Sequence, residues 1–240
     1  MALPKIDTPI YELKLPLSRK TVKFRPFLVK EQKNLLMAIE ADDKETIERN
    51  IKQVLHNCTL TENIDIEKLP VIDVEYYFLN LRARSVGEVV ENTYLCNNVV
   101  NDEKCGNKLP VTFNILDITV SEMEKDADVI KLTDNITIKL KYPEFATIER
   151  IKSMDNSVDV AFEIIANSIE YIFDGSQYYY ANETTEKELL EFIESLNSEQ
   201  FTNIEKFFDN LPKLNKKIEV KCSKCGYQHN IDMEGLESFF

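Results

Sequence analysis

Four cysteines form the most distinctive chemical pattern in this 240-residue chain. Cys222 and Cys225 are separated by two residues, and Cys96 and Cys105 lie more than a hundred residues earlier. Each pair ends on a Cys-Gly dipeptide, whose glycine can take the positive φ that closes a tight turn around two thiolates. Four thiolates match the ligand number and type that Zn²⁺ prefers. We therefore predict one zinc site, assembled from two distant loops.

The two cysteine pairs differ in spacing. The Cys-x-x-Cys motif at 222–225 has the spacing of a zinc ribbon, whereas eight residues, 97–104, separate the cysteines of the first pair. We expect this insert to bulge outward as a polar loop. Because four thiolates leave no coordination position for water, the predicted zinc is structural rather than catalytic. His229 is the spare ligand if a cysteine of the first pair is not bound.

Two other interpretations of the cysteines have less support. A disulfide framework is typical of small secreted chains, but this chain has a fifth cysteine, Cys58, and no apolar signal run in residues 1–7. A redox-active Cys-x-x-Cys normally opens a helix, which lowers the pKa of one thiol. Here residues 226–231 read Gly-Tyr-Gln-His-Asn-Ile, which favours a turn and a strand. Zinc remains the expected cofactor.

The rest of the sequence does not predict catalysis. The two histidines, His56 and His229, lie outside any nucleophile or metalloprotease motif. The five glycines form no phosphate-binding loop. The formal charge of −13 argues against a general nucleic-acid binder, because Lys and Arg supply most affinity for phosphates. We also expect no membrane span, since no apolar run reaches the roughly 18 residues that a spanning helix needs.

Hydrophobic periodicity predicts an α+β fold, with helical regions packed on small antiparallel sheets. A zinc-ribbon-like element should combine residues 88–116 with residues 217–233, and the intervening segment is inserted between them. The expected domains are an N-terminal hairpin with helices, 1–87, and an α+β region, 88–240, unless the two form one continuous domain. The expected strands are 11–15, 21–25, 88–95, 109–116, 129–132, 136–142, 218–220 and 228–233, and the expected helices include 28–39, 47–55, 67–84, 158–172, 185–193 and 201–211.

Two ends of the chain are candidate partner contacts. Residues 1–35 carry eight Lys or Arg against three acids, which predicts either a solvated basic hairpin or a docking arm for an acidic partner. The chain ends on two phenylalanines, which must be covered by this protein's own core or by a partner. The predicted contact residues are Arg19, Lys20, Lys23, Arg25, Phe239 and Phe240.

Three segments carry a resemblance to a known family. They are residues 21–33 (Thr-Val-Lys-Phe-Arg-Pro-Phe-Leu-Val-Lys-Glu-Gln-Lys) with 35–38 (Leu-Leu-Met-Ala), the motif Cys-Ser-Lys-Cys-Gly at 222–226, and the Phe-Phe end. The chain resembles the baseplate hub assembly proteins of T4-like contractile-tailed bacteriophages over most of its length. The resemblance implies a non-enzymatic protein that contacts other hub proteins, including tape-measure or central-spike components. It also implies assembly in the host cytoplasm, and it leaves open whether the protein stays in the tail baseplate of the virion.

A zinc-ribbon protein that binds nucleic acid, such as a transcription accessory factor, is the alternative. It would need a basic face near the ribbon. Near the two cysteine pairs, acidic and basic residues instead balance one another. The acids are Asp102, Glu103, Asp232, Glu234 and Glu237, and the bases are Lys104, Lys108, Lys221 and Lys224.

Overall fold

The computed structural model describes residues 6–40, 44–151, 154 and 156–239 and confirms the α+β class. Contacts divide the chain into two compact units. Unit 1 comprises Met1–Ile66, Ile72–Ser121 and Lys213–Phe240, and unit 2 comprises Glu67–Val71 and Glu122–Pro212. Among the helices that these residues form, none is both long enough and apolar enough to cross a membrane.

The N-terminal part of unit 1 is a β-hairpin packed with three helices, as the sequence predicts. Phe24 of the hairpin is buried edge-on against Tyr77, with ring centroids 5.4 Å apart. The buried Asp73 carboxylate accepts hydrogen bonds of 2.8 Å from the backbone N–H groups of Leu17 and Ser18, which fixes the hairpin turn to a helix. The elements are β1 (Tyr11–Lys14), β2 (Thr21–Phe24), α1 (Val29–Glu40), α2 (Lys44–Cys58) and α3 (Val71–Val86).

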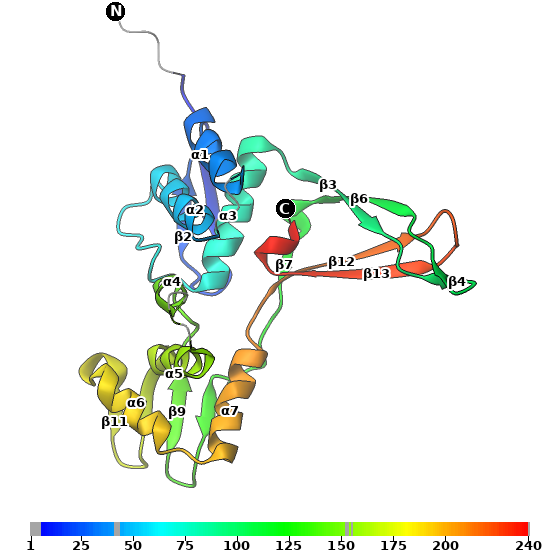
Figure 1. The fold of residues 1–240 in the computed structure, drawn as a ribbon. Coiled ribbons are helices and arrows are strands. Elements are labelled where there is room, and N and C mark those ends of the chain that lie inside the picture. Colours follow the sequence, from blue (N-terminus) through cyan, green and yellow to red (C-terminus); the bar gives the residue numbers. More distant parts are fainter. Residues whose placement is uncertain (1–5, 41–43, 152–153, 155, 240) are drawn as a thin grey trace, which may run out of the picture. The chain divides into compact units, whose positions relative to one another are not determined.

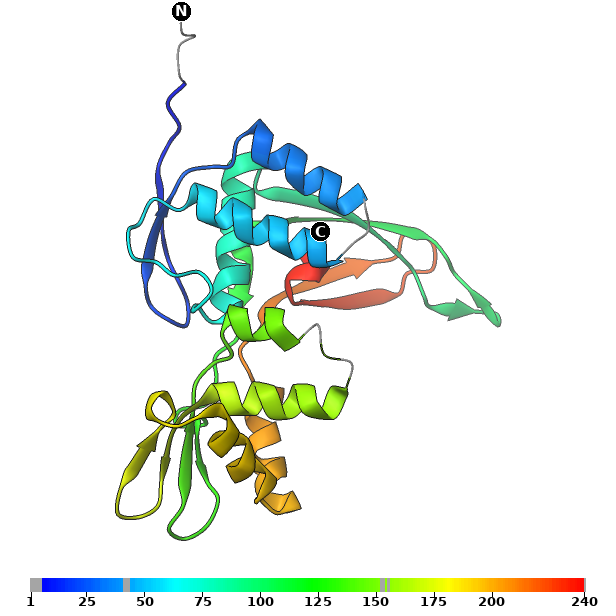
Figure 2. The same cartoon turned by 60° about the vertical axis from the view of Figure 1, so that its left-hand side comes forward.

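Two long antiparallel ribbons complete unit 1. Figures 1 and 2 show both ribbons running away from the helices of unit 1 and meeting at their far ends. Alternate residues on the facing sides are apolar, including buried Val111, Phe113 and Met233, so each strand contributes one side to a shared core. The first ribbon pairs β3 (Val89–Leu95) with β6 (Lys108–Asn114); the second pairs β12 (Leu214–Lys221) with β13 (Gln228–Glu234), and β7 (Thr119–Val120) adds to β12.

Unit 2 is a four-stranded antiparallel sheet covered by helices. The strand order is β11-β10-β9-β8, and Ile138, Leu140 and Ile172 point to the helix-covered side together with buried residues of the helices. Its elements are β8 (Val129–Lys131), β9 (Thr137–Leu140), α4 (Phe145–Ile151), α5 (Ser157–Ser168), β10 (Ile169–Phe173), β11 (Tyr178–Tyr180), the short 3-10 helix η2 (Ala181–Glu183), α6 (Glu186–Glu194) and α7 (Ser198–Asp209). Unit 1 contains two further short 3-10 helices, η1 (Ile115–Asp117) and η3 (Leu236–Phe239).

The prediction of one helix over residues 158–172 is wrong in its last four residues. Helix α5 ends at Ser168, and Ile169 has the extended backbone angles φ −70° and ψ 128°. The following residues, Ile-Glu-Tyr-Ile-Phe, form β10 and pair with β9. β-branched and aromatic side chains favour a strand once a neighbouring strand is available. Ile169 and Ile172 are therefore core residues, but of a sheet.

The division into units does not fall at residue 87, where the sequence suggests a boundary. Leu79 and Ala83 of α3 share one buried cluster with Val90 of β3 and Phe113 of β6, so the core of unit 1 continues across that position. The chain leaves unit 1 after β7 and returns to it at β12, and these two strands pair with each other. The division into domains 1–87 and 88–240, or one continuous domain, stays a prediction.

Candidate metal centre

The four predicted cysteine ligands come together at the far ends of the two ribbons. Their Sγ atoms all lie within 4.8 Å of one another. The Sγ of Cys96 is 3.6 Å from that of Cys225, and the Sγ of Cys105 is 3.8 Å from that of Cys222. A zinc tetrahedron with Zn–S bonds of about 2.3 Å has edges of about 3.8 Å. A disulfide needs about 2.05 Å, and all four thiols are free.

The turn at 222–225 has the backbone pattern expected for a thiolate-binding loop. The Cys222 N–H donates to the Tyr227 carbonyl at 2.8 Å, and the Gly226 N–H donates to the Cys222 carbonyl at 2.9 Å. Gly226 has φ 74°, as the sequence predicts. This turn closes β12 onto β13 and places both cysteines on one side.

The first pair repeats this backbone pattern around its insert. The Cys96 N–H donates to the Asn107 carbonyl at 2.8 Å, and the Gly106 N–H donates to the Cys96 carbonyl at 3.0 Å. Gly106 has φ 62°. The cysteine-glycine ends of the two turns therefore have equivalent roles, although one loop is six residues longer than the other.

The insert 97–104 bulges outward but is a small hairpin rather than a plain polar loop. Val99–Val100 (β4) pairs with Glu103–Lys104 (β5) across Asn101 and Asp102. These two turn residues have φ 52° and 64°, the left-handed geometry of a type I′ turn. Val99 and Val100 are exposed.

Hydrogen bonds to sulfur favour the thiolate form of two of the cysteines. The pKa of Cys222 is lowered to about 6, chiefly by the backbone N–H of Cys225 and also by the Asn107 amide, whose Nδ2 is 3.5 Å from Sγ. The pKa of Cys225 is lowered by the Tyr227 N–H and by Asn98. Thiolate is the form that binds metal.

Cys96 behaves in the opposite way before a metal binds. Burial and the neighbouring thiols raise its pKa to about 12, although the backbone N–H of Asn98 opposes this shift. Three nearby sulfurs without a cation disfavour a further negative charge. A divalent cation at the centre would remove that penalty.

The sequence analysis missed Asn98 and Asn107 as partners of the cysteines. Their side-chain amides approach the Sγ atoms of Cys225 and Cys222 at 3.6 and 3.5 Å, each from the opposite cysteine pair. The sequence does contain a pattern that could have revealed them, because each asparagine follows a cysteine of the first pair by two residues. These amides couple the two loops directly.

The two histidines and the fifth cysteine lie outside the four-sulfur cluster. His229 Nε2 is 3.1 Å from the Cys96 Sγ, and its ring packs edge-on against Tyr227 at 4.8 Å. His229 therefore contacts a candidate ligand instead of replacing it. His56 is exposed on α2, and Cys58 is buried near Arg25, where burial raises its pKa to about 11.

Two of the predicted partner contacts have structural roles within unit 1. The Arg25 side chain is 17% exposed and forms an ion pair of 3.1 Å with Glu31, and it also donates to the Asn57 carbonyl. Phe239 is 0% exposed and packs edge-on against Phe113, with ring centroids 6.1 Å apart. Both residues are thus held by their own unit, and their contact with a partner stays a prediction.

The other predicted partner contacts, Arg19, Lys20, Lys23 and Phe240, remain predictions. Arg19 and Lys20 are exposed at the hairpin turn, and Lys23 is exposed on β2 beside Glu12 at 3.7 Å. Phe240 lies outside the described residues.

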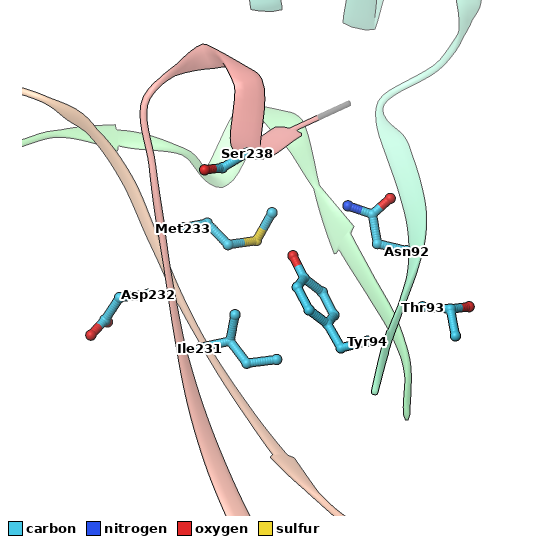
Figure 3. A pocket seen from close by; sticks show the side chains of 7 residues that line it. All are labelled: Asn92, Thr93, Tyr94, Ile231, Asp232, Met233 and Ser238. Atoms are coloured by element: carbon cyan, nitrogen blue, oxygen red, sulfur yellow. The ribbon is translucent and has the colours of Figure 1, made fainter. Parts of the chain in front are cut away.

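A pocket of about 460 Å³ lies between the ribbons, nearer the core than the cysteines. Figure 3 shows Tyr94 of β3 directed toward Ile231 and Met233 of β13, whereas Asp232 points away from this space. Side chains from both ribbons therefore meet along their length, and the cysteines complete this contact at the end.

Comparison with known proteins places these features in a family. The family described as T4 bacteriophage base plate protein matches residues 8–240. The chain is 24% identical over 231 residues to the baseplate hub assembly protein gp26 of Enterobacteria phage T4, an alignment that covers 96% of this chain and 97% of that protein. No solved structure matches the chain significantly. Because the family match spans nearly the whole sequence, this chain belongs to the T4 bacteriophage base plate protein family.

Proposed function

We propose that this protein is a structural and assembly component of the hub of a contractile-tail baseplate, and that it acts through protein contacts rather than catalysis. The observation that carries this proposal is the near full-length relationship to a hub assembly protein. Its partners are other hub proteins, including tape-measure or central-spike components. It works in the host cytoplasm during assembly and in the baseplate of the virion.

One structural Zn²⁺, held by Cys96, Cys105, Cys222 and Cys225, is part of this proposal. The support is the set of sulfur–sulfur distances, which match a tetrahedral site, and the hydrogen bonds that favour thiolates. The ion would join the ribbons of residues 88–116 and 217–233 into a zinc-ribbon-like element. A metal tie between segments so distant in sequence would hold the C-terminal strands in place.

The nucleic-acid-binding alternative has less support. The formal charge of −13 opposes phosphate binding, and Asp102 and Glu103 lie at the tip of the first loop beside the Lys residues there. Family membership also favours the baseplate.

Deletion of the gene from its phage, with complementation from a plasmid, tests the proposal. We expect the deletion to stop the formation of complete tails, counted by electron microscopy, and the intact gene to restore them. His56→Gln should restore tails as well as wild type does, because that exposed side chain has no role in the proposed contacts. Normal tails after deletion would refute the hub role, and loss of tails with a folded His56→Gln protein would favour an enzyme.

A further inference from the structure

The negative charge of the protein is concentrated in unit 2. This unit contains 9 Lys or Arg against 21 Asp or Glu, a formal charge of −12, while unit 1 carries 20 against 21, a charge of −1. A charge of this size on the 96 residues of 67–71 and 122–212 gives unit 2 a strongly negative potential. The fold itself does not require it, so the charge suggests a role in partner selection.

The sheet of unit 2 has one covered face and one open face. Ile138 and Ile172 point toward the helices and are buried. Side chains alternate along a strand, so Tyr171 and Phe173 of β10 lie on the other face, with Tyr178 and Tyr180 of β11 opposite them. Figure 2 shows the helices of this unit gathered on one side of the strands.

Four aromatic rings form a continuous cluster on the open face. Tyr178 is 4.6 Å from Phe173 and 5.1 Å from Tyr171, and Tyr180 is 6.0 Å from Tyr171 and 6.1 Å from Tyr178, measured between ring centroids. Tyr178 and Tyr180 remain 52% and 45% exposed, and their rings are nearly parallel at 19°. Such a cluster on an edge strand presents π faces to solvent.

Acidic residues outnumber basic ones near this cluster. Lys139 of β9 lies opposite Tyr171 on the same face, and its charge is paired with Asp128 at 2.6 Å. Between positions 170 and 188 the chain carries five acids and one Lys. Glu170 of β10 and Glu183 of η2 are exposed toward the end of the hairpin where Tyr171 pairs with Tyr180, and Asp174 is held at the turn by hydrogen bonds from Ser176 and Tyr179. Cations are attracted both by carboxylates and by the faces of tyrosine rings. The surface is therefore complementary to Arg and Lys side chains.

We propose that the open face at β10–β11 is a docking surface for a basic, extended segment of a partner protein, with Arg or Lys side chains over Tyr178 and Tyr180. This inference deepens the proposed function and rests on its assumption of protein partners. Nucleic acid also stacks on aromatic rings, but the charge of −12 would repel its phosphates. A protein segment is the occupant that fits both the rings and the acids.

Binding of a synthetic peptide to the intact chain tests the chemistry. The probe is a labelled ten-residue peptide of alternating Thr and Arg, with a Thr-Glu peptide and a dT₁₀ oligonucleotide as comparisons, followed by fluorescence anisotropy. We expect only the Arg peptide to bind. The double variant Tyr178→Ser/Tyr180→Ser should weaken binding about 5- to 30-fold, the value for two exposed cation–π contacts.

Tyr179 also donates a hydrogen bond to Asp174, so Tyr179→Phe is included to measure the effect of losing that bond alone. Tyr179→Ser is the control for removal of a ring, because Tyr179 is on the same strand, is 43% exposed and lies opposite the buried Ile172 on the other face. We expect it to change the affinity less than twofold. Glu183→Lys leaves all four rings intact and should weaken binding at low salt by up to about fivefold. Circular dichroism verifies that each variant is folded. Equal effects of the serine variants on both faces, or tighter binding of dT₁₀ than of the Arg peptide, would overturn the proposal.

Photocrosslinking identifies the natural occupant during infection. Benzoylphenylalanine at position 180 should crosslink to a segment rich in Lys or Arg from another baseplate protein, and the same group at position 179 should not. Crosslinks to a second copy of this chain or to an acidic segment would refute the surface. The gene-deletion phenotype does not depend on this result, so failure of the surface and failure of the hub role are distinguishable.

Discussion

The two units of this protein achieve stability in different ways. Unit 2 covers one face of a four-stranded sheet with helices, and its apolar core has no cysteine among its residues. Unit 1 contains all five cysteines of the chain and extends two two-stranded ribbons away from its helices. Two-stranded ribbons are marginal by themselves in water. Four of the cysteines lie where those ribbons are farthest from other support.

Burial along the ribbons explains why the cysteines are at this position. Near the helices, the ribbons share Phe113, Leu214 and Met233 with the main core. At the far end the buried residues are only Cys96, Leu109 and Cys222 among those described. Apolar contact decreases along the ribbons, and the proposed zinc would tie them together where this contact ends. The four-cysteine cluster thus lies where the two ribbons share the fewest buried apolar residues.

Metal removal should produce the largest difference between the units. A structural zinc can contribute an apparent binding free energy of about 10 kcal/mol or more. We expect one zinc per purified chain, and we expect chelation to increase hydrogen exchange in 89–114 and 214–234 while 137–140 and 157–173 stay protected. Exchange measured by mass spectrometry, together with metal analysis, checks this outcome.

Single cysteine variants provide the control for this experiment. Cys222→Ser should lose the metal, and Cys58→Ser should retain it because Cys58 lies outside the four-sulfur cluster. Retention of full zinc by Cys222→Ser would contradict the assignment. Equal loss of protection in both units would contradict the comparison.

Truncation of a terminal ring should give the second largest effect, again in unit 1. Phe239 is fully buried, so Phe239→Ala should cost about 3–5 kcal/mol of the free energy of unfolding. Val89→Ala, at an exposed position of β3, should change it little. Thermal denaturation measures both. If Phe239→Ala leaves the melting temperature unchanged but abolishes binding to hub proteins, the ring belongs to an interface after all.

The buried ion pair of unit 1 should make its stability depend on pH. Burial would raise the pKa of Glu31, but the Leu28 N–H and the Arg25 guanidinium hold it below the ordinary value. A lowered folded-state pKa contributes stability above the unfolded value of about 4.3, and this contribution is lost as the pH falls through the folded-state pKa.

Glu31→Gln should therefore destabilise the protein by about 1–3 kcal/mol at pH 7, and the difference from wild type should shrink in acid. Glu12→Gln is the matched control, since the Glu12–Lys23 pair is exposed on both sides. Urea unfolding at several pH values measures the difference. A deficit that is constant down to pH 3 would exclude the ionised pair as its cause.

A helix cap in unit 2 should give the smallest effect. Thr185 and Glu188 form a reciprocal capping box at the start of α6, as the sequence predicts. Thr185→Ala should cost about 1 kcal/mol, because it leaves a backbone N–H without its partner. Thr185→Ser keeps the hydroxyl and should retain most of that stability. The effect should appear as faster hydrogen exchange in 186–194, with the ribbons of unit 1 unaffected.

The sequence by itself determined the features that depend on neighbours a few residues apart. The Cys-x-x-Cys turn with its glycine, the alternation of β1 and β2, and the capping box of α6 are all local patterns. Each is specified by side chains that bond or pack within one turn or one hairpin. The family resemblance was also available from the sequence, because it needs no coordinates.

Only the tertiary structure decided features that depend on distant partners. Ile169 and Ile172 fit a helical stripe equally well, and it is β9 that makes them a strand. Arg25 belongs to a basic segment that the sequence predicts as a possible docking arm, but Glu31 and Asn57 bind its side chain within unit 1. Phe239 is buried because Phe113, 126 positions earlier, provides a surface for its ring. Long-range packing selects among conformations that local preference leaves nearly equal in free energy.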